Sequence, residues 1–214
     1  LQTRLKRKLG VDDLAGMQVG TFHSICARML REHYDLFGVK QDYVIMDSDD
    51  QKRLVRRLGK AIYGKNVDKD LIDATIDFIE NVRGNPAEKG QIINNADPAI
   101  YNIYAQYEKT KTEDGVLDFT DLISIVTEAF YNGIVDPEMF ASKWKHILVD
   151  EYQDTNRPQY LLTKLLAAEH HNLCVVGDDD QSIYQFRGAD IRNILDFEKD
   201  YPDAVVVRLE QNYR

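Results

Sequence analysis

Two adjacent acidic residues, Asp150 and Glu151, directly follow the apolar run Ile147–Val149. The run is typical of a buried strand, and ligands of open α/β sheets lie beyond the carboxyl ends of the strands. Phosphoryl transfer needs a carboxylate that holds Mg²⁺ and a second group that positions or deprotonates the attacking water. The acidic pair can supply both functions. An acidic turn after a strand is also very common, so the pair alone indicates no reaction.

A second apolar run, at 173–176, ends in Gly177, three aspartates and Gln181. Clustered acids beside a phosphate site can tune Mg²⁺ and water, and the alternative is a solvated turn. Two aromatic side chains and an arginine follow within four positions: Tyr184, Phe186 and Arg187. Such groups form stacking platforms for unpaired bases, and they are equally typical of an ordinary core.

The third candidate is Arg214, a few positions beyond the apolar run at 205–207. An arginine beyond a strand end can reach a transferring phosphate and neutralise the charge that develops on it. A terminal arginine by itself is usually part of a solvated tail. If all three runs are parallel strands of one sheet, we expect Asp150, Glu151, Gln181 and Arg214 to meet at one edge.

The elements that would position these residues change in character after Gly115. Upstream, the sequence predicts a helix over 1–9 that stops at Gly10, a short strand at Met17–Phe22 and a helix from Ser24 to Phe37. Downstream, three short apolar runs alternate with two helical segments; the runs lie at 147–149, 173–176 and 205–207, and the helices over 160–168 and 191–197. This alternation is typical of a parallel sheet covered by helices.

Residues 47–115 are helical throughout by periodicity. An acidic, cap-rich start at 47–50 opens the block, Gly84-Asn85-Pro86 breaks it, and Asp97-Pro98 begins its last helix with proline at the first helical position. We therefore predict an α/β domain made of residues 1–46 and 116–214, interrupted by an all-helical insertion at 47–115.

The composition allows several functions and excludes few. A chain of 214 residues with 43% hydrophobic residues can bury one large domain or two small ones. The formal net charge of −9 argues against nucleic acid, but binding depends on the local field of one groove, and basic residues cluster at 4–8 and 52–57. No apolar run is long enough for a membrane helix, and the basic first residues, with no apolar segment behind them, are not expected to form a secretory signal. Cys26 and Cys174 lie in apolar runs and are predicted to be reduced core residues of a cytoplasmic protein.

Taken together, the motifs resemble the superfamily 1 DNA helicases of the UvrD, PcrA and Rep type. The segment at 150–156 matches motif II of that family, 177–189 resembles motif III, and 209–214 resembles motif IV. Gly20-Thr21-Phe22-His23-Ser24 resembles the segment before the family's helical insertion, and 117–122 the segment where the chain returns from it. The resemblance covers essentially the whole chain, in order and at plausible spacing.

The resemblance implies a RecA-like motor that uses ATP and Mg²⁺ and moves 3′ to 5′ along single-stranded DNA during repair or replication. It implies that Asp150 binds Mg²⁺, Glu151 activates water, Gln181 senses the γ-phosphate, Arg214 contacts that phosphate and Tyr213 stacks on adenine. Its DNA-gripping positions correspond to Phe119, Tyr184, Phe186 and Arg187, with Thr21 and His23 near the DNA path. Relatives usually carry Trp at the position of Phe186, so stacking there should be weaker.

A phosphate-binding loop of the form Gly-x-x-x-x-Gly-Lys-[Ser/Thr] does not occur in the sequence. The resemblance places that loop upstream, so we expect a fragment: the later part of motor domain 1A with helical domain 1B inserted, inactive in ATP hydrolysis alone. We also expect the missing strand to leave a gap between the strands at 147–149 and 173–176, closed by local collapse or by a substitute strand.

Two other interpretations stay open. One is a subunit of a helicase–nuclease of AddA or RecB type, since a nuclease domain further along the gene would leave these motifs unchanged. The other is a module that binds single-stranded DNA, or a repair or replication protein, without hydrolysing ATP. A phosphate-binding loop upstream and a second motor domain downstream would favour the helicase.

Overall fold

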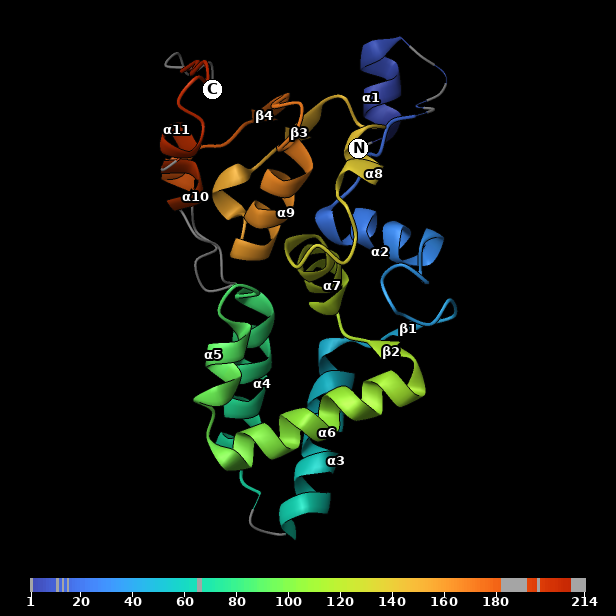
Figure 1. Ribbon diagram of the computed structural model, residues 1–214, viewed down its shortest axis with the longest axis vertical. Helices are drawn as coiled ribbons and strands as arrows, with labels where there is room; N and C mark the ends of the chain where they lie inside the picture. Colours follow the sequence, from blue (N-terminus) through green and yellow to red (C-terminus); the bar gives the residue numbers. More distant parts are fainter. Residues whose placement is uncertain are drawn as a thin grey trace.

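The computed structural model describes residues 2–10, 12, 14, 16–64, 67–181, 192–195 and 197–208. They form two parts that follow one another along the long axis of the molecule (Figure 1). The upper part contains strands β3 (Ile147–Val149) and β4 (Leu173–Val175) with helices α2 (Phe22–Glu32), α7 (Asp121–Tyr131) and α9 (Arg157–Ala167). The lower part contains α3 (Ser48–Tyr63), α4 (Lys69–Gly84), α5 (Lys89–Asn94) and α6 (Pro98–Asp114). No helix among the described residues has the length and apolarity to cross a membrane.

Local capping sets the helix boundaries of the lower part. The Asp47 carboxylate accepts the Asp50 N–H at 2.8 Å at the start of α3, and Asp68 does the same for Leu71 N–H at the start of α4. Asp97 caps α6, and proline occupies its first position. Each cap satisfies N–H groups that a helix start leaves without partners. The helix start near 47, the break at 84–86 and the start at 97–98 are confirmed.

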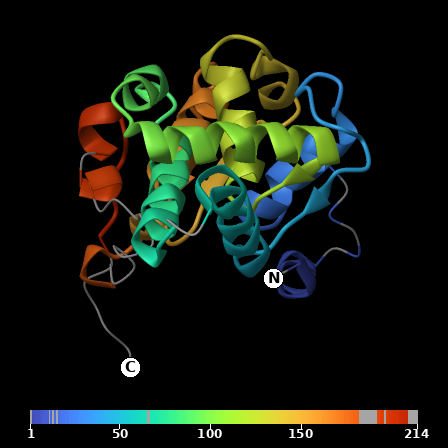
Figure 2. The same cartoon turned by 90° about the horizontal axis from the view of Figure 1, so that it is seen from below.

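The lower part has its own core. Helix α6 packs across α3 and α4, which Figure 2 shows from below. Fully buried apolar side chains from all three helices meet there: Val55, Ile79, Val82, Ile103 and Tyr107. The division of the chain into an α/β domain and a helical insertion remains a prediction, and these separate cores favour it.

A pair of two-residue strands stands where the chain enters and leaves the helical part. Strand β1 (Val44–Ile45) runs parallel to β2 (Val116–Leu117), with Val44 opposite Val116 and Ile45 opposite Leu117. Helix α6 ends at Gly115, whose left-handed φ of 67° turns the chain into β2. The two ends of the helical part are therefore tied together, a feature that the sequence analysis did not predict.

The two strands of the upper part are direct neighbours. Strands β3 and β4 pair in parallel, with Ile147 opposite Leu173, Leu148 opposite Cys174 and Val149 opposite Val175. The ladder continues beyond them, because Val176 N–H donates to Val149 C=O at 2.8 Å and Tyr152 N–H to Val176 C=O at 3.0 Å. The two strands pair directly, with no strand between them, which corresponds to the local collapse named among the expected outcomes.

Helices α2, α7 and α9 enclose the core of the upper part. Cys26, Leu30 and Val126 are fully buried there, and Leu162 lies beside them. Helix α9 was predicted, three residues shorter at its start, but α7 was not. Most residues of α7 are buried, among them the polar side chains of Asp121, Ser124 and Thr127.

Several predicted elements of the upper part are wrong. Met17–Phe22 forms no strand; helix α2 begins at Phe22, with Thr21 as its N-cap. Val205–Val207 is exposed and forms no ladder with any strand among the described residues. β-Branched residues form a strand only where a neighbouring strand satisfies their backbone groups. Strand β3 is not buried on both faces, because Leu148 is 75% exposed. Cys174 is exposed on β4, whereas Cys26 is buried as expected, and both are free thiols.

The remaining elements are short. They are α1 (Gln2–Leu9), which was predicted, α8 (Glu138–Ala141), α10 (Arg192–Leu195) and α11 (Phe197–Asp200). The last two lie within and just beyond the helix predicted over 191–197. The side chain of Asn193, on α10, donates to Thr155 C=O at 2.9 Å and so holds this segment beside the turn that follows β3.

Candidate functional site

The carboxyl ends of β3 and β4 lie at one edge of the parallel pair and carry the acidic residues. Asp150 and Glu151 follow β3 directly, and both are exposed. The Asp150 carboxylate accepts the Glu151 N–H at 3.0 Å, which leaves its other oxygen available for a ligand. Among the strands that the structure describes, the predicted strand-end position of this pair is therefore observed.

Glu151 has an unusual backbone conformation. Its φ of 52° and ψ of 44° lie in the left-handed region, which a residue with a Cβ rarely adopts. Such strain is of order 1–3 kcal/mol and persists where the surrounding structure enforces it, often at functional sites. The turn that it creates leads directly into the 3₁₀ helix η2 (Tyr152–Asp154) and directs the chain back under the sheet edge.

Gln153 connects the two strand ends. Its side-chain Nε2 donates to Glu151 Oε2 at 2.8 Å, and its Oε1 accepts the Asp178 N–H at 3.0 Å. Gln153 is only 1% exposed, so this bridge is fixed in the core. A Cβ on Gly177 would lie 2.6 Å from Gln153 Oε1 and 2.7 Å from Ile194 Cδ1, so only glycine leaves room for the bridge. The Glu151 carboxylate is therefore held by Gln153, which is itself hydrogen-bonded to Asp178 in the segment after β4.

The bridge extends to Gln181, in the 3₁₀ helix η3 (Asp179–Gln181) that follows β4. Gln181 N–H donates to Asp178 C=O at 3.1 Å, and its side-chain amide donates to the Asp178 carboxylate. Asp180 N–H donates to the other Asp178 oxygen at 3.1 Å. Asp178 therefore shapes this turn, and the structure brings Asp150, Glu151 and Gln181 to one edge.

Asp154 lies below this edge, partly buried. Its Oδ1 is buried and makes no hydrogen bond within the described part of the chain. Burial, followed by the nearby charge of Glu151, raises the pKa of the Asp154 carboxyl. Glu151 thus has a second acid nearby that protonates more readily than an exposed aspartate.

A second candidate site is an aromatic pair. His23, on α2, stacks on Phe119, which lies between β2 and α7; the ring centroids are 4.0 Å apart and the planes 25° from parallel. Phe119 is 55% exposed, so one face of the pair is open to solvent. Burial lowers the pKa of His23, which favours the neutral imidazole at neutral pH. An exposed, uncharged aromatic pair is a suitable platform for an unpaired base.

Thr21 contributes to this site through the backbone. Its hydroxyl accepts the Ser24 N–H at 3.3 Å and its carbonyl accepts the Ser24 hydroxyl at 2.9 Å, which fixes the first turn of α2. His23 is in that turn, so the Thr21 cap fixes the backbone that carries the imidazole. A direct ligand contact by Thr21 remains a prediction.

The other predicted residues lie outside the described part of the chain: Tyr184, Phe186, Arg187, Tyr213 and Arg214. Conversely, Gln153 and Gly177 were not assigned a function from the sequence, and Asp178 was considered only as one of three clustered acids. The available signal was the side-chain amide of Gln153, two residues after Glu151, but its role depends on a contact with Asp178, 25 residues away in sequence.

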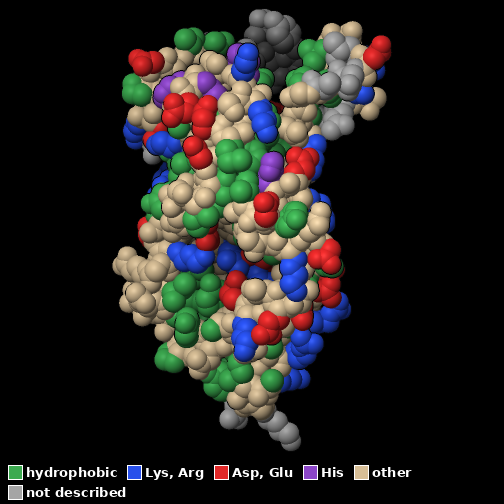
Figure 3. Space-filling view, turned by 45° about the vertical axis from the view of Figure 1, so that its right-hand side comes forward, with side chains coloured by type: hydrophobic (Ala, Val, Ile, Leu, Met, Phe, Trp, Pro, Cys, Tyr) green, Lys and Arg blue, Asp and Glu red, His purple; other side chains and the backbone are tan. Residues whose placement is uncertain are grey.

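The basic residues of α3 are partly neutralised, since Lys52 pairs with Asp73 at 2.9 Å and Arg53 with Asp50. Figure 3 shows basic and acidic side chains interspersed over the helical part.

The edge at Asp150 fits Mg²⁺ by its donor chemistry. Mg²⁺ prefers hard oxygen ligands and is commonly held by one or two carboxylates together with substrate phosphates. Asp150 and Glu151 offer exposed carboxylate oxygens, and no group of three or more His, Cys, Asp or Glu side chains within the described ranges forms a complete metal cage. The residues present suit a shared Mg²⁺–phosphate site better than a structural metal.

Comparison with known proteins gives consistent results. Residues 1–202 match the family model described as the UvrD/REP helicase N-terminal domain. The chain is 43% identical over 208 residues to the ATP-dependent DNA helicase PcrA of Bacillus subtilis, covering 96% of this chain and 28% of that protein. It is 39% identical over 217 residues to PcrA of Staphylococcus aureus strain Mu50, covering 100% of this chain and 30% of that protein. The chain thus spans less than a third of the length of these curated relatives.

Proposed function

The chain belongs to the UvrD/REP helicase N-terminal domain family, and on this premise we propose that it forms part of the motor of an ATP-dependent DNA helicase. The observation that carries the proposal is the buried Gln153 bridge, which joins Glu151 after β3 to Asp178 after β4. A nucleotide motor needs such rigid positioning of carboxylates at one sheet edge, because phosphoryl transfer depends mainly on placement and electrostatics.

In this proposal each strand-end residue has one task. Asp150 would hold Mg²⁺, which when bound would offset the charge of the ATP phosphates. Glu151, kept in place by Gln153, orients the attacking water and accepts its proton. Gln181 contacts the γ-phosphate from the turn after β4. Arg214 contacts the same phosphate and Tyr213 stacks on the adenine, as the family resemblance implies.

Single-stranded DNA is the proposed track. The His23–Phe119 pair presents an open aromatic face on which a base can stack. Tyr184, Phe186 and Arg187 are proposed to contact the same DNA strand, as the family resemblance implies. The net charge of −9 means that the DNA contact depends on local geometry and stacking more than on a basic surface.

The proposal also assigns the two parts of the chain. Residues 1–46 and 116–214 belong to the motor domain, and 47–115 form the inserted helical domain. The 214 residues contain no Gly-x-x-x-x-Gly-Lys-[Ser/Thr] string, so the phosphate-binding loop has to come from outside them and the chain alone should not hydrolyse ATP. Movement from 3′ to 5′ in the cytoplasm and partners in DNA repair or replication follow from the family resemblance.

The test is ATP hydrolysis by the intact protein with and without a single-stranded oligonucleotide. We expect hydrolysis that requires Mg²⁺ and rises on addition of the oligonucleotide. Binding of the oligonucleotide without any hydrolysis would refute the motor and favour a single-strand-binding module.

A further inference from the structure

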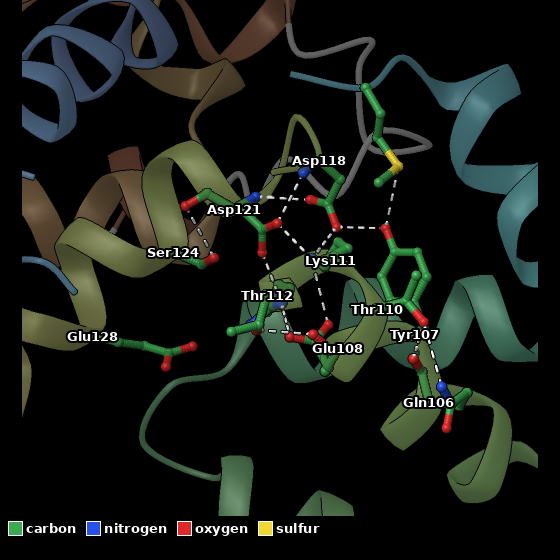
Figure 4. A network of polar contacts seen from close by, with 12 residues as sticks. Gln106, Tyr107, Glu108, Thr110, Lys111, Thr112, Asp118, Asp121, Ser124 and Glu128 are labelled. Carbon is green, nitrogen blue, oxygen red and sulfur yellow. Dashed lines mark hydrogen bonds and ion pairs between the residues drawn. The ribbon is translucent and has the colours of Figure 1, made fainter. Parts of the chain in front are cut away.

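A cluster of buried charges lies where the lower, helical part of the molecule meets the upper part. It joins Arg83 on α4 and Glu108 and Lys111 on α6 to Asp118, in the loop after β2, and Asp121, the first residue of α7. Figure 4 shows Glu108, Lys111, Asp118 and Asp121. The side chains of Arg83, Lys111, Asp118 and Asp121 are only 7%, 4%, 2% and 1% exposed. Desolvating so many charges is costly, and such clusters give less stability than an apolar core would. Their value lies in fixing one geometry.

The geometry that the cluster fixes is the turn 118–121. Asp118 N–H donates to Asp121 Oδ2 at 2.8 Å, and Asp121 N–H donates to Asp118 Oδ1 at 2.9 Å. These two reciprocal hydrogen bonds close the turn that leads into α7. The carboxylate of each acid also contacts side chains from outside the turn.

Those partners come from the helical part. Lys111 Nζ lies 2.8 Å from Asp118 Oδ2 and also donates to Asp121 Oδ2, and Arg83 lies 2.7 Å from Asp121 Oδ1. The Tyr107 hydroxyl donates to Asp118 Oδ2 at 2.8 Å. Burial opposes ionisation of Asp118, but Lys111 and Arg83 outweigh it and lower its pKa to about 2. Asp118 is therefore held ionised by α4 and α6, whereas burial, with the nearby charge of Asp118, raises the pKa of Asp121.

Phe119 is the second residue of this turn. Its neighbours Asp118 and Asp121 are fixed in the cluster, whereas its own ring points outward, 55% exposed, and stacks on His23. We infer that the buried charges of Arg83, Lys111, Asp118 and Asp121 form a positioning device that holds Phe119 against His23 for single-stranded DNA. The DNA part of this inference rests on the proposed function, and the positioning part does not.

The helical part thus also positions a residue of the upper part, Phe119. Because Arg83 and Lys111 belong to α4 and α6, a shift of these helices relative to α7 would move the turn and open the stacked pair. Asp118, Asp121, Lys111 and Arg83 are thus positioning residues, and Phe119 and His23 are the groups that touch the strand.

A matched control is available on the same helix. Glu128, on α7, pairs with Lys89 on α5, so this partly buried ion pair also joins α7 to the helical part. It lies two turns further along α7 than Asp121 and does not touch the turn 118–121. Glu128→Gln therefore weakens the same interface without disturbing the reciprocal hydrogen bonds of the turn 118–121.

The first experiment observes His23 directly. In the intact protein with ¹³C-labelled histidine, the ring protons of His23 should be shifted by the ring current of Phe119, and Phe119→Ala defines loss of that shift. We expect Asp118→Asn to move the signal most of the way to the Phe119→Ala position and Tyr107→Phe, a milder change, to move it less. Glu128→Gln should leave it in place. An unchanged His23 signal in both Asp118→Asn and Tyr107→Phe would overturn the inference.

The second experiment is a double-mutant cycle on single-strand affinity, measured well below every melting transition. Phe119→Ala should weaken binding by about 5- to 150-fold, the range of one base–aromatic stack. Asp118→Asn should weaken it by a similar factor, and the double variant no further than Phe119→Ala alone, because both remove the same contact. Additive losses, or an equal loss in Glu128→Gln, would show that the cluster only stabilises the fold. If Phe119→Ala leaves affinity unchanged, the DNA contact is refuted, and the His23 signal still decides the positioning.

Discussion

Replacing Gln153 by leucine tests how the strand ends cooperate. Leucine is of similar size and keeps the core filled, but it removes both hydrogen bonds of the bridge: the 2.8 Å bond to Glu151 and the 3.0 Å bond from Asp178 N–H. A bond to a carboxylate contributes about 1.5–3 kcal/mol and a neutral one about 1 kcal/mol. Glu151 is exposed, so water replaces part of the loss.

We therefore expect Gln153→Leu to lower stability by about 1–3 kcal/mol, or the melting temperature of a domain this size by about 2–12 °C. The effect on ATP turnover should be larger than stability explains. Glu151 loses its only side-chain anchor among the described residues, so turnover should fall by about tenfold or more, yet less than the 10²–10⁴ expected for loss of the base itself.

The assay is DNA-stimulated ATP hydrolysis by the intact protein at a temperature where all variants are folded. Gln159→Leu is the matched control, because Gln159 also accepts one backbone N–H, from Asn156 at 3.0 Å, but it caps α9 and does not touch Glu151. Equal turnover in Gln153→Leu and Gln159→Leu would refute the reasoning and make the bridge a purely structural contact.

Glu151→Gln should leave ATP binding by the intact protein nearly unchanged and reduce turnover by about 10²–10⁴, since only the proton acceptor is lost; a near-normal turnover would remove Glu151 from this role. Phe186→Ala should weaken single-strand binding by about 1–3 kcal/mol and affect basal ATP hydrolysis less than its DNA-stimulated part. The pKa of Asp118 is about 2, below the value of about 4 in an unfolded chain, so its stabilisation is present above pH 4 and lost as pH falls through 2. As the pH falls, the melting temperature of the wild type should thus drop more steeply than that of Asp118→Asn. Identical pH dependence of the two melting temperatures would contradict the ionised cluster.

The parts of the fold that local chemistry determines were predictable from the sequence. Asp47 and Asp97 cap their helices with contacts two to three residues away, and Gly10 and Gly84 end theirs. The positions of Asp150 and Glu151 after β3 were predicted for the same reason, since an apolar run followed by acids is a local pattern.

The parts that depend on distant contacts were not predictable. Whether β3 and β4 are neighbours depends on sheet order, which the two runs do not encode. Gln153 gains its role only when Asp178 lies beside it, and Lys111 and Asp118 become partners only when β2 returns the chain against α6. Val205–Val207 shows that strand-forming residue types alone are not sufficient, because none of the described strands pairs with this segment.

The most direct test of the proposed helicase is strand separation by the intact protein on a fluorescent duplex with a single-stranded 3′ tail. With ATP and Mg²⁺ we predict unwinding of this substrate, little unwinding of the same duplex with a 5′ tail, and none in Glu151→Gln. Unwinding that continues in Glu151→Gln, or ATP hydrolysis with no strand separation on either tail, would contradict the account.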